Sequence, residues 1–181
     1  MVNPILSPTG GQGVSGQQRQ LAPRLLDLRG KTVGLLVNGK ANSALFLAEL
    51  GTLLKAEGVV RLVVRTKPQA TMPAPLELVK EMAVECDAVV TAMGDCGSCS
   101  AAAVSDALAV EDEGVPAAVI CSDAFMVTVD AMAAVERAPG YAYATTAHPV
   151  ANLSPEQVRE RARDVLASVV SLVTVGMGSA A

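Results

Sequence analysis

Two cysteines separated by two residues are the most chemically informative pair in this 181-residue chain. Cys96 and Cys99 follow an apolar run, and the residues after Cys96 are typical of the first turn of a helix. Unpaired N–H groups at a helix N-terminus stabilise negative charge, and thiol pKa values there, next to cations, can fall to roughly 3.5 to 7.5. We therefore predict that Cys96, at the loop apex, is a nucleophilic thiolate and that Cys99, one turn into the helix, resolves it.

The same predicted helix start is suited to hold a substrate. The backbone N–H groups from Gly97 to Ser100 can bind a carboxylate, or the oxyanion formed when the sulfur attacks. Gly97, Ser98 and Ser100 are therefore predicted to bind substrate.

Other reactive or polar side chains follow predicted strands. Asn38, Lys40 and Asn42 come after the apolar run at 31–37, and His148, the only histidine, comes after the run at 141–146. The carboxyl ends of parallel strands meet at one edge of a sheet, so we expect these residues to converge with Cys96. We predict that His148 transfers protons and that Lys40 and the two asparagines orient substrate.

Cys121 ends the predicted strand at 115–121 and is expected at the same edge, where it is a further substrate-binding candidate. Cys86 falls at the opposite edge and is expected to be structural. An alternative interpretation combines Cys96, Cys99, Cys121 and His148 into a metal site suited to zinc, or to iron or copper with one position open. Apart from that alternative, the sequence indicates no cofactor.

The elements that must position these residues are short β-branched runs alternating with amphipathic stretches. Strands are predicted at 31–37, 59–65, 86–92, 115–121 and 141–146, and helices at 42–58, 75–85, 98–113, 124–137 and from 154 onward. This alternation predicts an α/β three-layer sandwich around a five-stranded parallel sheet, in the flavodoxin-like order 2-1-3-4-5.

The chain is predicted to contain one folded domain, residues 29–176. Residues 1–28 are rich in Gly, Gln, Pro and Ser and are predicted to be a disordered or partner-docking arm. Residues 177–181 are predicted to be a flexible tail.

Composition excludes several classes of protein. The chain is 51% apolar and 2% aromatic, with a net charge of −4, which argues against intrinsic disorder and against nucleic-acid binding. Residues 81–136 contain eleven Asp or Glu and no Lys or Arg. A thiolate in that window needs positive neighbours from elsewhere, and Lys40 and His148 are the predicted ones.

No segment is typical of a signal peptide, and the apolar stretch at 165–175 is too short to cross a bilayer. We therefore expect a cytoplasmic protein that does not bind membranes, in which cysteines serve catalysis, redox chemistry or metal binding. The expected partners are a small-molecule substrate and further copies of the chain in a homo-oligomer.

The sequence resembles the UGSC selenoproteins and their cysteine-containing forms, which are related to the C-terminal part of the selenoprotein B component of glycine, sarcosine and betaine reductases. The resemblance is carried by Gly30 to Asn42 (GKTVGLLVNGKAN), by Cys96-Gly97-Ser98-Cys99, by Cys121 and by His148-Pro149. In the seleno forms the first position of the UGSC motif is selenocysteine. The resemblance therefore implies that Cys96 is the reactive chalcogen and that Cys99 is its partner in a disulfide step.

Together these observations predict a thiol-dependent oxidoreductase, or a lyase or hydrolase, that cleaves a carbon–heteroatom bond of a small molecule. An alternative is a non-catalytic subunit or carrier in a reductase-type complex, which depends on a partner reductase subunit for its chemistry.

Overall fold

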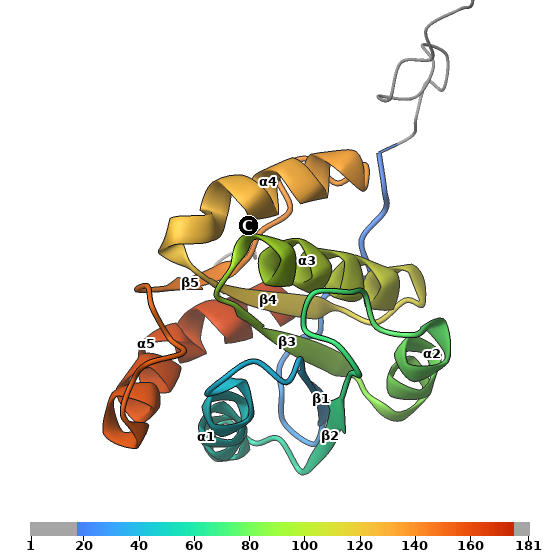
Figure 1. The fold of residues 1–181 in the computed structure, drawn as a ribbon. Helices are drawn as coiled ribbons and strands as arrows, with labels where there is room; N and C mark the ends of the chain where they lie inside the picture. Colours follow the sequence, from blue (N-terminus) through green and yellow to red (C-terminus); the bar gives the residue numbers. More distant parts are fainter. Residues whose placement is uncertain (1–17, 176–181) are drawn as a thin grey trace, which may run out of the picture.

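A single sheet of five parallel strands organises the part of the chain that the computed structural model describes, residues 18–175 (Figure 1). The strands are β1 (Thr32–Val37), β2 (Arg61–Thr66), β3 (Ala88–Gly94), β4 (Ala117–Ser122) and β5 (Ala144–Thr146). They lie in the order β2-β1-β3-β4-β5, which confirms the predicted topology. The switch point of this arrangement lies between β1 and β3.

Helices cover both faces of the sheet and make a three-layer sandwich (Figure 1). They are α1 (Ser43–Ala56), α2 (Leu76–Glu85), α3 (Gly97–Asp112), η1 (Asp123–Phe125), α4 (Met126–Val135) and α5 (Pro155–Val173). Helices α1 and α5 lie on one face, and α2, α3 and α4 lie on the other. The largest difference from the predicted elements is β5, which is only three residues long. Tyr141, predicted within that strand, lies before it and donates its hydroxyl to the carbonyl of Ala117.

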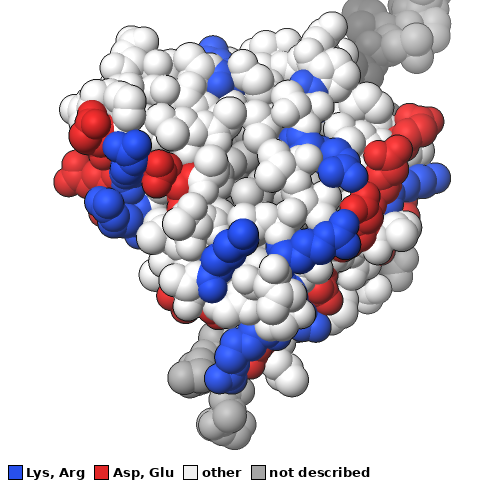
Figure 2. Space-filling view, turned by 90° about the horizontal axis from the view of Figure 1, so that it is seen from below, with Lys and Arg blue, Asp and Glu red and all other residues white. Residues whose placement is uncertain are grey.

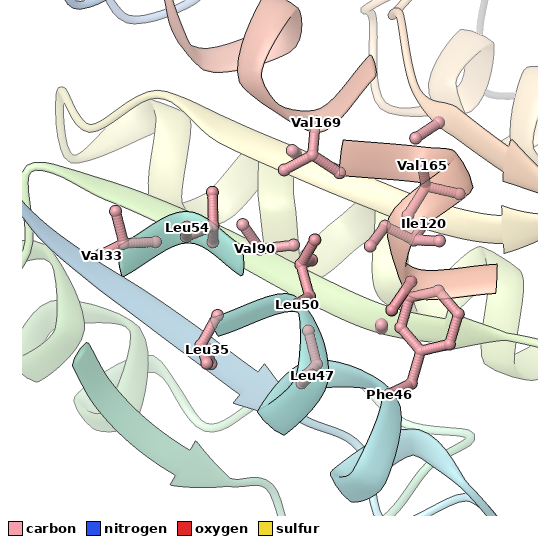
Figure 3. Close-up of a cluster of buried hydrophobic side chains, with 14 of the residues drawn as sticks. Val33, Leu35, Phe46, Leu47, Leu50, Leu54, Val90, Ile120, Val165 and Val169 are labelled. Carbon is pink, nitrogen blue, oxygen red and sulfur yellow. The ribbon is translucent and has the colours of Figure 1, made fainter. Parts of the chain in front are cut away.

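Aliphatic side chains build a separate core on each face of the sheet. On the α1 and α5 face, Leu50 and Phe46 of α1 pack with Val165 of α5 and with strand residues such as Leu35 (Figure 3). On the opposite face, α3 contributes mainly Ala and Val, so it can lie close to β3 and β4. An apolar core therefore covers each face of the sheet.

Part of the predicted N-terminal arm is bound to the domain, which corrects the expectation for residues 18–28. Arg19 pairs with Asp112 at 2.8 Å, and the buried carboxylate of Glu111 accepts the N–H of Ala22 at 2.7 Å. Leu25 bridges to Thr174 at the end of α5. Most of the predicted arm, residues 1–17, and the predicted tail, residues 177–181, lie outside the described residues.

Cations from outside the acidic window neutralise many of its carboxylates. Lys67 pairs with Asp106 on α3, and Arg61 and Arg65 both contact Glu85. The face seen from below also carries basic and acidic side chains next to one another (Figure 2). Several cations from outside the window therefore form ion pairs with its carboxylates. Among the helices of residues 18–175, none combines the length and apolar composition that a membrane span requires.

Candidate functional site

Cys96 caps the N-terminus of α3, as the sequence predicts. Its backbone is extended, and its Sγ accepts a hydrogen bond from the backbone N–H of Cys99 at 3.3 Å. The Oγ of Ser98 lies 3.7 Å from the same sulfur. Cys96 is half-buried and Ser98 is exposed, so this sulfur lies at the surface of the helix start.

Cys96 and Cys99 form a disulfide, with their Cα atoms 5.3 Å apart. Cys99 is fully buried in the first turn of α3, behind Cys96. An incoming molecule therefore meets Cys96 first. The arrangement fits an attacking thiol and a resolving partner, with the pair in its oxidised form.

Gly94 allows the first turn of α3 to lie against the end of the sheet. A Cβ atom at this position would be 2.8 Å from the Cβ of Cys121 and 2.8 Å from the Oγ of Ser100. The Oγ of Ser100 is buried and has no hydrogen-bond partner among the described residues. Of the predicted substrate-binding residues in this turn, Gly97 and Ser98 face the surface, whereas Ser100 lies beneath it.

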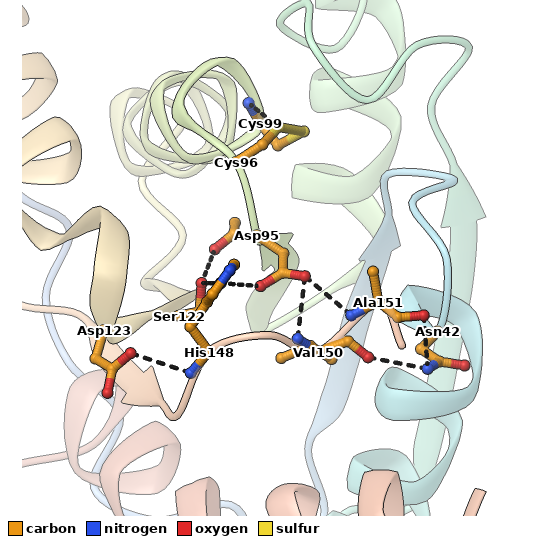
Figure 4. Close-up of polar contacts among 10 residues, drawn as sticks. Asn42, Asp95, Cys96, Cys99, Ser122, Asp123, His148, Val150 and Ala151 are labelled. Atoms are coloured by element: carbon orange, nitrogen blue, oxygen red, sulfur yellow. Dashed lines mark hydrogen bonds and ion pairs between the residues drawn. A yellow bond between two sulfur atoms is a disulfide. The ribbon is translucent and has the colours of Figure 1, made fainter. Parts of the chain in front are cut away.

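His148 lies beside Asp95, the residue that links β3 to Cys96 (Figure 4). The Nδ1 atom of His148 is 3.0 Å from Oδ1 of Asp95 and 3.1 Å from the Oγ of Ser122. Phe125 contacts the imidazole edge to face, with ring centroids 5.4 Å apart. The side chain of His148 is 40% exposed and that of Asp95 is 2% exposed. The structure therefore brings a histidine–carboxylate pair to the predicted edge of the sheet.

Asp95 is the residue that sequence reasoning missed. Its Oδ2 accepts the backbone N–H groups of Val150 and Ala151, at 3.0 and 2.9 Å, so the carboxylate holds the loop that carries His148. The available signal was an Asp directly before Cys96 in a loop that follows a mostly apolar strand. Its histidine partner is 53 positions away, and only the fold brings the two together.

The predicted asparagines organise loops. Asn42 donates its amide to the carbonyls of Val150 and Leu153, at 2.9 and 3.0 Å. Asn38 is buried and donates to the carbonyl of Met93 at 2.9 Å. Neither amide is therefore directed at Cys96. The ammonium of Lys40 has no ion pair within residues 18–175, and Lys40 stays a candidate for substrate binding.

The structure does not bring His148 to Cys96 in this oxidised form. No hydrogen bond joins the two side chains in the described part of the chain, and Figure 4 shows the disulfide set apart from the imidazole. The contacts of the sulfur come from its own helix turn. The sequence predicts cationic neighbours for a thiolate at this position. In the disulfide form, the hydrogen-bond donor to Sγ is the backbone N–H of Cys99.

Cys121 and Cys86 are free cysteines, and both are buried. Burial is the main reason that the pKa of Cys121 is raised to about 12 and that of Cys86 to about 11. Cys121 belongs to β4 and packs in the core on the face of the sheet that α3 covers. Among residues 18–175, no three His, Cys, Asp or Glu side chains are grouped as a metal site requires. The geometry therefore does not support the alternative site of Cys96, Cys99, Cys121 and His148 for zinc, iron or copper.

Two surface cavities, of about 600 and 470 Å³, lie away from these residues. The first lies between the residues before β1 and the end of α5, and the second lies beside Arg19 and Glu111. Neither is lined by Cys96, Asp95 or His148. The candidate site is the polar surface at the carboxyl ends of β3, β4 and β5.

Comparison with known proteins identifies one family. A family model described as the UGSC family matches residues 4–175. No curated protein matches the sequence. One similar solved structure is described as an ABC transporter permease from the Pseudomonas fluorescens group, with 15% identity and a TM-score of 0.42. The match covers 76% of this chain and 32% of that chain, so this chain spans about a third of that protein.

Proposed function

This chain belongs to the UGSC family, and from that membership and the geometry of Cys96 and Cys99 we propose that it is a cysteine-dependent enzyme acting on a small molecule. Cys96 is the attacking thiolate, and Cys99 is the resolving thiol. The reaction is the reductive or lytic cleavage of a carbon–heteroatom bond.

The observation that carries the proposal is the hydrogen bond from the N–H of Cys99 to the Sγ of Cys96 at the start of α3. This donor belongs to the unpaired N–H groups at the positive end of the helix dipole, which favour negative charge on the sulfur. A half-buried sulfur in that position combines access for a substrate with stabilisation of its anion.

In the reductive version, the two thiols supply the two electrons. The carbon–heteroatom bond of the substrate breaks, the carbon and the heteroatom each gain one hydrogen, and Cys96 and Cys99 become the disulfide of the structure. A dithiol reductant then returns the disulfide to two thiols by exchange. A reducing compartment such as the cytoplasm fits this cycle.

A substrate with a carboxylate or amide group fits the site best. The first turn of α3 offers backbone N–H donors at Gly97 and Ser98, and the ammonium of Lys40 follows β1 at the same edge of the sheet. These groups would hold the polar end of the substrate while its reacting carbon faces Cys96.

The proposal is tested with iodoacetate and iodoacetamide on a Cys99→Ser variant, in which Cys96 cannot form its disulfide. The thiolate attacks the methylene carbon of either probe and iodide leaves. The rate with iodoacetamide reports access to Cys96, and the ratio of the two rates reports preference for a carboxylate. We expect the ratio of iodoacetate to iodoacetamide rates at Cys96 to be higher in the folded protein than in the urea-unfolded chain. A Cys96→Ser variant is the matched control for the labelled site. Equal ratios, or slower labelling of folded than of unfolded Cys96, would overturn the proposal.

A further inference from the structure

Only hydrogen-bond acceptors face the Nδ1 atom of His148. The carboxylate of Asp95, at 3.0 Å, can only accept. The hydroxyl of Ser122, at 3.1 Å, donates its single hydrogen to the carbonyl of Gly94 at 3.3 Å, so towards the imidazole it too can only accept. The proton of the neutral imidazole must therefore be on Nδ1.

We propose that Asp95 and Ser122 hold His148 in the Nδ1–H tautomer, so that Nε2 is the proton-accepting atom of this site and Asp95 is its positioning residue. The two ring nitrogens of a histidine are distinct, and the partner of one nitrogen fixes the role of the other. A buried carboxylate at Nδ1 also stabilises the imidazolium that forms when Nε2 accepts a proton.

The carboxylate is itself held in place. Its second oxygen accepts the N–H groups of Val150 and Ala151, and Asn42 binds the carbonyls of the same loop (Figure 4). The backbone N–H of His148 donates to Asp123 at 3.0 Å. Main chain and ring are therefore fixed from different sides, while the partly exposed imidazole remains accessible from solvent.

This arrangement separates stabilisation of the Cys96 thiolate from proton transfer by the imidazole. A cysteine–histidine pair would combine these two tasks. Cys96 accepts its hydrogen bond from the N–H of Cys99, and no hydrogen bond joins it to His148 in residues 18–175. Resting on the proposed function, we assign Nε2 to the substrate. Nε2 takes a proton from water, so the ring becomes an imidazolium with Nδ1–H still bonded to Asp95. When the Sγ of Cys96 bonds to the substrate carbon and the carbon–heteroatom bond breaks, this proton passes from Nε2 to the leaving heteroatom.

The tautomer can be measured directly because His148 is the only histidine in the chain. Protein labelled with 15N-histidine, freed of any affinity tag, gives one pair of ring nitrogen signals. At a pH high enough to keep the ring neutral, we expect a protonated Nδ1 and an unprotonated Nε2. A wild-type ring protonated on Nε2 would overturn the proposal without any variant.

Asp95→Asn is expected to invert the tautomer. The amide oxygen must stay with the N–H groups of Val150 and Ala151, so the NH2 group turns towards Nδ1, which then accepts and leaves the proton on Nε2. Asp123→Asn is the matched control, because Asp123 binds the backbone of His148 and leaves the ring free. We expect Asp123→Asn and Ser122→Ala to keep the wild-type tautomer.

If Asp95→Asn folds and keeps the wild-type tautomer, or if Asp123→Asn inverts it, the role of Asp95 is wrong. If Asp95→Asn does not fold, the wild-type and Ser122→Ala spectra decide. The measurement uses no substrate and no cysteine chemistry, so its result is separate from the labelling of Cys96. Failure of that labelling would overturn the proposed enzyme and leave the tautomer assignment standing.

Discussion

The backbone N–H of Cys99 donates to the sulfur of Cys96 over 3.3 Å, so the first turn of α3 directs a donor at the sulfur of its own N-cap residue. The sequence predicts Lys40 and His148 as the positive neighbours of a Cys96 thiolate. The donor that contacts the sulfur in the disulfide form belongs to the same helix turn as the sulfur itself.

Removing either predicted cationic neighbour is therefore expected to change the labelling of Cys96 little. In fully reduced protein, we expect Lys40→Ala and His148→Ala to keep the iodoacetamide rate at Cys96 within about threefold of wild type, because more distant charges are screened by solvent and salt. Rates are read by mass spectrometry of the Cys96 peptide across pH. A tenfold loss in His148→Ala would show that a cysteine–histidine pair forms after reduction.

Adding one methyl group at Gly94 is expected to disturb the site through packing. The new Cβ would contact Ser100 Oγ and Cys121 Cβ at 2.8 Å, closer than real Cβ atoms approach. We expect Gly94→Ala to lower the free energy of unfolding by about 1–3 kcal/mol and to slow labelling of Cys96.

Gly97→Ala is the matched control for that substitution, because a Cβ at Gly97 meets nothing within 4 Å. We expect its stability to differ from wild type by less than about 1 kcal/mol in urea unfolding. Equal effects at the two glycines would contradict the packing argument.

The buried cysteines predict a loss of stability at alkaline pH. Burial raises the pKa of Cys86 from 9.0 to about 11 and that of Cys121 from 9.0 to about 12. The folded chain thus keeps these protons while the unfolded chain releases them above pH 9, so rising pH favours unfolding. We expect the free energy of unfolding of the reduced protein to fall from about pH 9 upward.

Tyr143, whose pKa is raised to about 12 mainly by burial, adds a slope in the same direction, so a control is needed. The double variant Cys86→Ala/Cys121→Ala should show a smaller loss than wild type between the same pH values in urea unfolding. An unchanged slope would mean that the two thiols ionise as readily in the fold as in the unfolded chain.

The ion pair between Lys67 and Asp106 is expected to be costly to break. Both side chains are fully buried, and Asp106 also accepts the N–H of Ala74 at 2.6 Å, which ties the loop before α2 to α3. Lys67→Met leaves a buried carboxylate without its cation and should cost about 3–5 kcal/mol of stability.

Burial raises the pKa of Asp106, so this carboxyl group holds its proton more tightly in the fold than in the unfolded chain. The stability lost in Lys67→Met should therefore shrink as pH falls. The double variant Lys67→Met/Asp106→Leu should recover much of the stability, because it leaves no unpaired charge. Thermal or urea unfolding at two pH values checks both statements. A double variant less stable than Lys67→Met would contradict them.

The topology could be predicted from sequence because strands, helices and loops alternate with regular spacing, and parallel strands then allow few arrangements. The position of Cys96 at a helix start followed from the same reasoning. Residue partners did not follow from it, since Asp95 and His148 are 53 positions apart and meet only because β3, β4 and β5 are neighbours. Likewise, burial of Cys121 and Ser100 depends on the close packing at Gly94, which local sequence does not reveal.

The acidic window at residues 81–136 is paired in the fold with cations from other parts of the chain. The absence of Lys and Arg from residues 81–136 predicts that a thiolate there has Lys40 or His148 as its positive neighbour. In the fold, Arg19, Arg24 and Lys67 enter the window to pair with carboxylates on α3. Ion pairs within residues 18–175 therefore engage several carboxylates of the window, and the backbone N–H of Cys99 is the donor to the Sγ of Cys96.

The most direct test of an activated Cys96 is its alkylation rate in fully reduced wild-type protein, measured across pH by mass spectrometry of each cysteine peptide. We expect Cys96 to be labelled fastest and its rate to persist below pH 7, and we expect Cys86 and Cys121 to stay unlabelled until the chain unfolds. Equal rates at Cys96 and Cys86, or a Cys96 rate that rises only towards the pH range of an ordinary thiol, would contradict this expectation.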